Sequence, residues 1–226
     1  MVPPIAIDID GTMTCPEGGV DPRLFEPLRT WEAPVVVATG KSFPYPVALC
    51  EFVGIEPRVI AENGGVVATS DTLAVVGDGE AARRTVEAYQ AAGHSIGRGR
   101  VDLHNRWRET EVSVSTESPY EPLVACAEEH GQTVVDTGYS YHVKSPDVSK
   151  GDGLVRIAAA LELEPASFVA IGDSANDVEL FAEAGDSFAV ANCDEHARAA
   201  AARVTEASHG AGALEALDRI AARAGD

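Results

Sequence analysis

Three short, continuous apolar runs along the chain predict buried strands. They cover residues 4–9, 34–38 and 167–171, and each ends in a polar or glycine-containing turn. Continuous apolar strands are typical of parallel sheets that are covered on both faces. Helical patterns alternate with these runs, for example at 151–162 and 175–185. Strands that alternate with helices indicate an α/β fold with a doubly wound parallel sheet.

The turns after the three runs are where we expect a functional site. They hold Asp8–Gly11, Thr39–Gly40 and Gly172–Asp173. In an open α/β sheet the ligand crevice lies beyond the carboxyl ends of the strands. These segments, which are far apart in the sequence, are therefore expected to meet at one place.

A different pattern separates the two stretches of parallel core. Residues 111–116 alternate apolar and polar side chains, as a half-buried strand does. The other elements predicted here are a helix over 81–93, a helix from Glu121 to His130, and strands near 132–136 and 140–144. This α+β pattern predicts an inserted second domain at 70–146, so that 1–69 and 147–226 form the core. The 66–80 region is ambiguous, because Gly and Asp interrupt its apolar runs.

Two of the strand ends carry paired carboxylates. Asp8 and Asp10 are two residues apart, and Gly11 permits a sharp turn after them. Asp173 and Asp177 are four residues apart, bridging a turn and the first turn of a helix. Asp-x-Asp alone is equally explained as a polar strand end followed by a glycine turn. An oxygen-rich cluster of this kind suits Mg²⁺ better than Zn²⁺.

The remaining strand end, Thr39-Gly40-Lys41-Ser42, contains Gly-Lys-Ser, but its spacing excludes a P-loop. That motif needs a glycine five positions before Gly40, where Val35 stands. The Thr39 hydroxyl and the exposed backbone N–H groups of this strand-to-helix turn are still suited to binding an anion. Thr39 is alternatively the N-cap of the next helix, which is compatible with anion binding. Lys150, just before a predicted helix, is either a solvated lysine or a point charge at the site.

Taken together, these segments resemble the haloacid dehalogenase (HAD) superfamily of phosphohydrolases. The resemblance rests on Asp8-Ile9-Asp10-Gly11-Thr12, Thr39-Gly40, Lys150 and Gly172-Asp173-Ser174-Ala175-Asn176-Asp177, in the family's order and spacing. Residues 61–65 and the position of the insert are similar to the Cof-type members, whose insert is called a C2B cap. The short length and the first motif are most like archaeal-type phosphoglycolate phosphatases. Lys41 departs from the pattern, since Asn or Arg is expected there.

The resemblance implies a HAD-like core with an inserted α+β cap, and it implies roles for the site residues. Asp8 is the nucleophile that becomes an aspartyl-phosphate, and Asp10 protonates the leaving alkoxide and then deprotonates water. The implied catalytic residues are Asp8, Asp10, Thr39 and Lys150, and Thr39, Gly40 and Lys150 bind the phosphoryl group. The implied ligands of Mg²⁺ are Asp8, Asp10 through its backbone carbonyl, Asp173 and Asp177. The implied reaction is hydrolysis of a small phosphate monoester, with 2-phosphoglycolate fitting best.

The cap in this family closes over the leaving group and selects it. Candidate contacts are the polar and aromatic residues Arg98, His104, Arg106, Tyr139, His142 and Lys144. For most of them, the simpler explanation is a surface or hairpin residue. The low aromatic content of 6% disfavours a large stacked substrate such as a nucleotide.

The net charge of the chain argues against some classes of binding partner. Asp and Glu total 36, Lys and Arg total 17, and the net charge is −19. Nucleic acids and anionic membranes both need a basic face, so neither is expected as a partner. The acidic excess reflects either an ordinary acidic protein with a GC-rich coding bias or, as we prefer, adaptation to a high-salt cytoplasm. Only Lys41, Lys144 and Lys150 are lysines.

The chain has the pattern of a cytoplasmic protein. Its N-terminus lacks the basic and long apolar regions of a signal peptide, and no window approaches the ~18 apolar residues of a membrane span. The four cysteines, Cys15, Cys50, Cys126 and Cys193, are far apart, so neither a zinc site nor a disulfide framework is expected. The expected partner is a small-molecule phosphate ester, and a homodimer is left open.

Two other functions are left open. Within the enzyme class, the chain is alternatively a sugar-phosphate phosphatase, such as one acting on sucrose phosphate. From another class, it is a receiver-like signalling module that holds phosphate on Asp8 without turnover. A receiver usually has about 120 residues and no inserted cap, so the 70–146 segment argues against the module.

Overall fold

The apolar runs form the centre of an eight-stranded sheet in the computed structural model, which describes residues 1–224. The strands are β1 (Ile5–Ile7), β2 (Val35–Ala38), β3 (Val59–Ala61), β4 (Val66–Ala68), β5 (Leu73–Val75), β9 (Val169–Gly172), β10 (Asp186–Ala189) and β11 (Arg203–Val204). Their order is β11-β10-β9-β1-β2-β3-β4-β5. Pairs from β11 to β3 are parallel, whereas β4 and β5 pair antiparallel at the edge. The α/β class expected from the sequence is confirmed.

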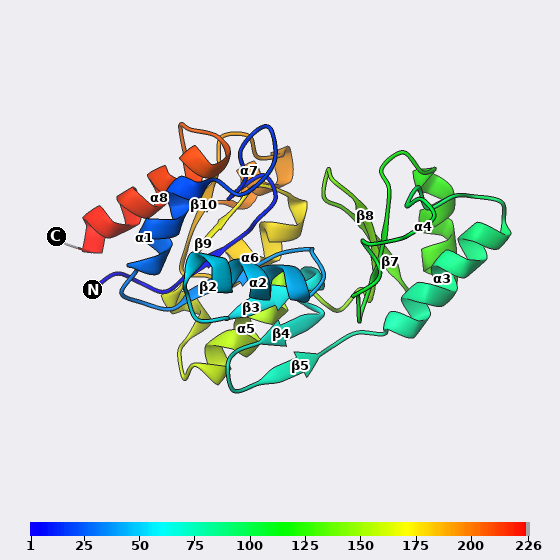
Figure 1. Ribbon diagram of the computed structural model, residues 1–226, viewed down its shortest axis with the longest axis horizontal. Coiled ribbons are helices and arrows are strands. Elements are labelled where there is room, and N and C mark those ends of the chain that lie inside the picture. Colours follow the sequence, from blue (N-terminus) through cyan, green and yellow to red (C-terminus); the bar gives the residue numbers. More distant parts are fainter. Residues whose placement is uncertain (225–226) are drawn as a thin grey trace.

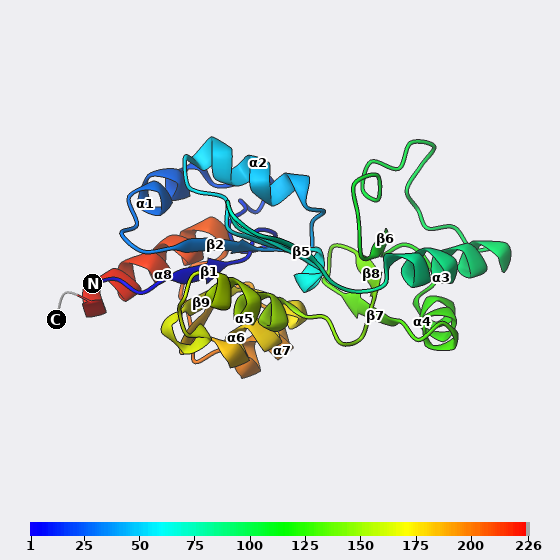
Figure 2. The same cartoon turned by 90° about the horizontal axis from the view of Figure 1, so that it is seen from below.

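Helices cover both faces of this sheet, as the apolar strands require (Figure 2). One face carries α1 (Phe25–Arg29), α2 (Pro44–Val53) and α8 (His209–Ala224), and the other carries α5 (Lys150–Ala160), α6 (Val178–Glu183) and α7 (Glu195–Ala200). Alternate residues of β1 face the two layers of helices. Ile5 and Ile7 pack toward the first set of helices, and Ala6 packs toward the second. Single turns of 3-10 helix lie at Pro22–Leu24, Glu62–Gly64, Pro165–Ser167 and Ala175–Asp177.

The inserted segment folds as a separate layer beside the core (Figure 1). It contains α3 (Gly79–Ala91), β6 (Val112–Val114), α4 (Tyr120–Glu129), β7 (Thr133–Asp136) and β8 (Tyr141–Lys144). The strands pair antiparallel in the order β6-β8-β7. Val114 and Val143 pack with Tyr89 of α3 and Leu123 of α4 in one apolar cluster. The helices therefore take the apolar face of this sheet, and its polar face is left for the core.

The insert begins later than expected. β5 lies in the ambiguous stretch and pairs with β4 in the core sheet, Val66 opposite Val75. The first element that packs on the small sheet is α3, which begins at Gly79. The expected boundary at residue 70 therefore falls inside the core sheet, because Gly and Asp obscured the pattern of a short edge hairpin.

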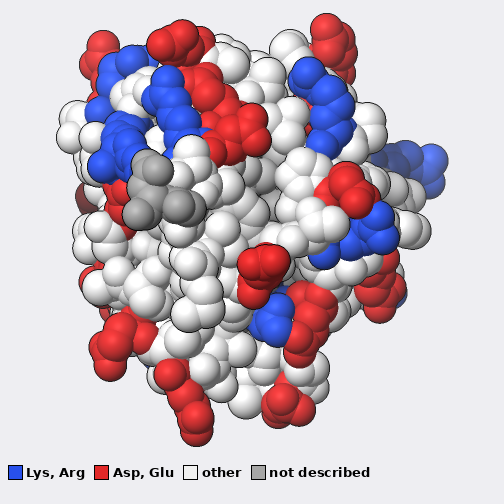
Figure 3. All heavy atoms as spheres, turned by 90° about the vertical axis from the view of Figure 1, so that its left-hand side faces the viewer, with Lys and Arg blue, Asp and Glu red and all other residues white. Residues whose placement is uncertain are grey.

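The acidic surface is interspersed with basic side chains at the end of the core that carries α8 and both termini (Figure 3). Several of these cations are paired with acids: Arg219 lies 2.6 Å from Glu215, and Arg223 lies 3.3 Å from Asp186. Exposed pairs of this kind contribute little to stability. Within residues 1–224, no helix has both the length and the apolar character that crossing a membrane requires.

Candidate active site

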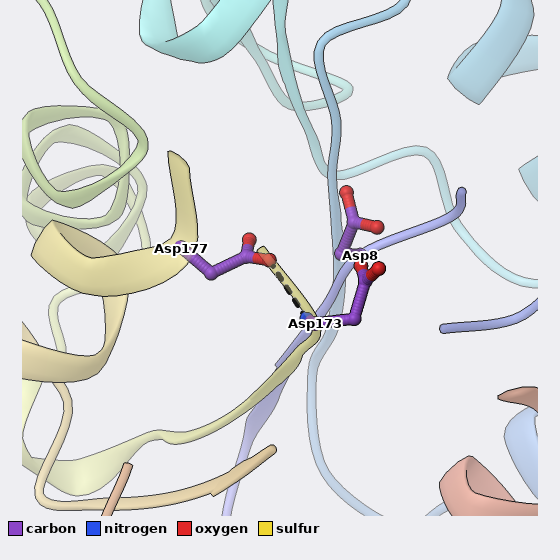
Figure 4. Close-up of side chains that lie close together, drawn as sticks. All are labelled: Asp8, Asp173 and Asp177. Atoms are coloured by element: carbon purple, nitrogen blue, oxygen red, sulfur yellow. Dashed lines mark hydrogen bonds between the residues drawn. The ribbon is translucent and has the colours of Figure 1, made fainter. Parts of the chain in front are cut away.

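Three carboxylates meet where two neighbouring strands end. Asp8 follows β1, Asp173 follows β9, and the two strands pair in parallel, so their carboxyl ends lie side by side. Asp177, in the 3-10 turn after Asp173, accepts a hydrogen bond from the Asp173 backbone N–H at 3.0 Å. One oxygen of each carboxylate lies within 4.8 Å of the others, and all three residues are buried (Figure 4). The structure thus brings together these three residues that the sequence pointed to.

Lys150 joins this cluster from the first turn of α5. Its Nζ is fully buried and donates at 2.7 Å to both Asp8 Oδ1 and Asp177 Oδ1. The glycines that follow allow this helix to approach the core closely. A Cβ at Gly151 would lie 2.6 Å from a backbone oxygen of Glu179, and one at Gly153 would lie 2.5 Å from a carbon of Ile60. The Lys-Gly-Asp-Gly sequence therefore places an ammonium group deep in the site.

The cluster carries more negative charge than the lysine can balance. Burial raises the pKa of Asp8, Lys150 lowers it, and the neighbouring carboxylates Asp177 and Asp10 raise it further. Burial, Asp8 and Asp177 likewise raise the pKa of Asp173. One ammonium group cannot neutralise three carboxylates, so the cluster has room for further positive charge. Converging carboxylate oxygens are the ligands that hard divalent cations prefer. Asp8, Asp173 and Asp177 could therefore hold a metal ion.

Asp10 lies beside this cluster rather than in it. Its carboxylate forms an ion pair with Lys41 at 2.8 Å, and both side chains are partly exposed. The turn between Asp10 and the next element needs a glycine, since Gly11 has φ +81 and a Cβ there would lie 2.0 Å from an oxygen of Asp173. Thr12 then donates from Oγ1 to Asp173 at 3.2 Å. The Asp8-Ile9-Asp10 segment thus places Asp8 in the buried cluster and Asp10 at its more exposed edge.

The Thr39-Gly40-Lys41-Ser42 segment forms the neighbouring strand end. Thr39 is buried, and its Oγ1 accepts a hydrogen bond from the Lys41 N–H at 3.1 Å. The expectation that Thr39 caps the next helix is wrong, because α2 begins only at Pro44 and its N-cap is Phe43. The buried Ser42 Oγ has no hydrogen-bond partner among residues 1–224.

A cavity of about 230 Å³ opens between this site and the polar face of the small sheet. Asp8, Asp10, Gly40 and Lys41 line its core side. Four of the six candidate cap contacts line the other side, namely Arg98, His104, Tyr139 and His142. Arg106 does not line it. Lys144 faces a separate cavity near Lys150, where its Nζ donates to the backbone carbonyls of Ser145 and Val148.

Similarity to known proteins agrees with this arrangement. A family model described as haloacid dehalogenase-like hydrolase matches residues 117–217. The phosphoglycolate phosphatase of Natronomonas pharaonis is 57% identical over 97% of this chain and 98% of its own length. That of Halobacterium salinarum is 54% identical over 96% of this chain and 97% of its own length. This chain belongs to the haloacid dehalogenase-like hydrolases.

Solved structures in this family share the whole architecture. A crystal structure from Thermoplasma acidophilum superposes with a TM-score of 0.85 at 25% identity, covering 97% of this chain and 98% of that one. A haloacid dehalogenase-like hydrolase from Bacteroides thetaiotaomicron gives a TM-score of 0.78 at 18% identity, covering 97% and 100%, which shows the fold alone. Both relatives named above come from halophilic archaea, in agreement with the high-salt interpretation of the acidic surface.

Two residues after β3 connect the hydrolase core to its cap. Glu62 is fully buried and accepts hydrogen bonds from the backbone N–H groups of Glu109 and Thr110. Asn63 donates to Glu111 Oε2 at 2.8 Å and accepts from Asn176 Nδ2 at 2.9 Å. Its left-handed backbone (φ 54) is one that asparagine tolerates better than most residues. Sequence reasoning linked 61–65 to the family but did not foresee this connection.

The junction between core and cap contains, on its cap side, a buried ionic network. The sequence did not predict this network. Glu111, with its side chain fully buried, binds Arg108 Nη1 and lies 2.7 Å from His142 Nδ1. Burial disfavours its charge, but His142, Arg108 and a hydrogen bond from Asn63 outweigh burial and lower the pKa of Glu111 to about 2. Arg108 also donates to the Gly40 carbonyl at 2.9 Å, which joins the cap to the Thr39-Gly40-Lys41-Ser42 segment of the core. The available signal was the alternation of polar residues in the 111–116 strand.

Proposed function

We propose that this hydrolase is a Mg²⁺-dependent phosphatase that converts 2-phosphoglycolate to glycolate and phosphate. The observation that carries the proposal is the buried group formed by Asp8, Lys150, Asp173 and Asp177 at the bottom of a small cavity. Burial raises the pKa of Asp8, and the Lys150 ammonium together with a bound cation would keep its carboxylate ionised, so that it can attack phosphorus without a base. The names of relatives that match nearly the full chain support 2-phosphoglycolate as the substrate.

The proposed reaction has two steps that share the same side chains. Asp8 attacks phosphorus, the bond to the ester oxygen breaks, and Asp10 gives its proton to the departing glycolate oxygen. Asp10 then takes a proton from a water molecule, which attacks the aspartyl-phosphate and releases phosphate and free Asp8. Lys150, held at 2.7 Å from Asp8, neutralises charge on the transferring group. Thr39 and the Gly40 N–H would bind the phosphoryl oxygens.

Asp8, Asp173 and Asp177 would hold the Mg²⁺ ion, together with the backbone carbonyl of Asp10. The bound cation would supply the positive charge that this carboxylate cluster lacks, which otherwise repels a phosphate dianion. The raised pKa values of Asp8 and Asp173 support this assignment, since they reflect buried carboxylates without enough counter-charge. We also propose a cytoplasmic location, and we expect no nucleic-acid or membrane partner.

The decisive experiment measures phosphate release from a panel of esters with Mg²⁺ and with EDTA, at low and high KCl. The panel contains 2-phosphoglycolate, sucrose 6-phosphate and p-nitrophenyl phosphate. We expect Mg²⁺-dependent release, with the highest kcat/KM for 2-phosphoglycolate. A preference for sucrose 6-phosphate would favour the sugar-phosphate alternative. A stable phospho-Asp8 without turnover would overturn the phosphatase proposal in favour of a signalling module.

A further inference from the structure

The permanently charged cations at the site differ in how they are balanced. Three lie within salt-bridge distance of a carboxylate: Lys150 with Asp8 and Asp177, Lys41 with Asp10, and Arg108 with Glu111. Arg98 lines the cavity from the cap side and forms no salt bridge within residues 1–224. Burial lowers the pKa of Arg98, and the Asp102 carboxylate, which lies beyond salt-bridge distance, offsets this only in part.

Arg98 is nevertheless held firmly in place, by uncharged groups of the small sheet. Its Nε donates to the Ser113 carbonyl at 3.3 Å, and its Nη2 donates to Ser113 Oγ at 2.6 Å and to Ser140 Oγ. The two serine hydroxyls lie 2.9 Å apart, on the polar face of the sheet. Gly97 allows the chain to run against this face, since its φ is +68 and a Cβ would lie 2.5 Å from Ser115.

These contacts leave one side of the guanidinium group for a ligand. Within residues 1–224, no atom accepts a hydrogen bond from Arg98 Nη1. Serine oxygens orient the group but do not cancel its charge, and partial burial disfavours an unpaired cation. A planar guanidinium group held in this way matches a carboxylate better than a point charge does.

We propose that Arg98 binds the carboxylate of the leaving group and thereby selects phosphate esters that carry a second anionic group. This inference rests on the proposed function: the phosphoryl end lies at Asp8 on the core side of the cavity, and the carboxylate end faces Arg98 on the cap side. Arg98 is then the specificity-determining residue of the cap. The core then carries out the reaction, and Arg98 of the cap determines which esters bind.

The test compares two esters that differ only at the recognised end. 2-Hydroxyethyl phosphate has a hydroxymethyl group where 2-phosphoglycolate has a carboxylate. We measure kcat and KM for both esters with the wild-type protein, Arg98→Gln and Arg100→Gln. Arg100 is exposed in the same loop and does not line the cavity, so it controls for the loss of one charge.

Arg98→Gln should lower the ratio of kcat/KM for 2-phosphoglycolate to that for 2-hydroxyethyl phosphate by about 10- to 100-fold, mainly through KM. Arg100→Gln should leave the ratio within about twofold. A wild-type protein that prefers 2-phosphoglycolate, with the same preference in Arg98→Gln, would overturn the role of Arg98 and leave the proposed function standing. A wild-type protein without any preference would overturn the proposed substrate. An equal loss on both esters in Arg98→Gln would show that Arg98 does not recognise the carboxylate.

Discussion

The two walls of the cavity hold their charges in opposite ways. On the core wall, three buried carboxylates face the single ammonium group of Lys150, so the wall lacks positive charge. On the cap wall, Glu111 contacts Arg108 and His142, and Arg98 has no carboxylate within salt-bridge distance in residues 1–224. In the proposed function, the core wall would receive a cation and a phosphoryl group, and the cap wall would receive the carboxylate of the substrate. The chemistry and the selectivity of the site can therefore be changed independently.

On the core wall, the largest effect is expected from a change at Asp8. Asp8→Asn keeps the shape of the side chain but removes the nucleophile, so kcat should fall by about 10⁴-fold or more. Phosphate release from 2-phosphoglycolate measures the loss. The matched control is Asp218→Asn, the same change on the exposed side of α8, which should keep normal activity. Near-normal hydrolysis by Asp8→Asn would show that another residue attacks phosphorus.

Lys150→Met should come next, because it removes the buried cation of the core wall. Breaking a buried ion pair costs about 3–5 kcal/mol, since the carboxylates left behind are uncompensated. We therefore expect a clear fall in the urea midpoint together with a loss of kcat of about 10²-fold or more. Arg156→Met removes one exposed positive charge from the same helix and serves as the control. Equal stability of the two variants would contradict the structural role given to Lys150.

The smallest of these effects is expected on the cap wall, from Glu111→Gln. Burial disfavours the charge of Glu111 in the folded protein, but His142 and Arg108 outweigh burial and lower its pKa from the ordinary value of 4.5 to about 2. The ionised group therefore adds stability that is fully present above about pH 5 and is lost as the pH falls through 2, on the order of 3 kcal/mol at neutral pH.

Urea unfolding at pH 7 and at pH 3 measures this contribution. The difference in free energy of unfolding between the wild type and Glu111→Gln should shrink to about half or less at pH 3. Glu109→Gln, an exposed change two residues away, should show little difference at either pH. A difference that is the same at both pH values would mean that the charge of Glu111 does not stabilise the junction.

The sequence predicted the core wall better than the cap wall, for a physical reason. Asp8, Asp173 and Lys150 stand directly after strands or at a helix start, where the direction of a parallel strand decides where a side chain ends up. Arg108 and Glu111 lie before the short strand β6, and the partners of Glu111, His142 and Asn63, come from distant segments. The pattern shows that such residues share a polar face, but not which of them pair.

The same limit explains the misplaced boundary of the insert. The edge strand β5 has two exposed residues, Leu73 and Val75, and only Ala74 between them is partly buried. Because all three residues of this strand are apolar, its sequence lacks the apolar and polar alternation that identifies a half-buried strand. Its place in the core sheet depends on pairing with β4, which is a tertiary contact and cannot be deduced from β5 alone.

The positions of the three lysines have a practical consequence for labelling and immobilising the protein. Lys41 lines the cavity, Lys150 lies beneath it, and Lys144 lines the adjoining cavity at the junction. Of these, Lys150 and Lys144 are buried, so Lys41 and the terminal amine are the accessible primary amines. An amine-reactive dye would therefore label the mouth of the active site as well as the terminal amine. A support that couples through amines would hold part of the molecules by that mouth, and none of the four cysteines is exposed, so a tag-directed attachment is the better choice.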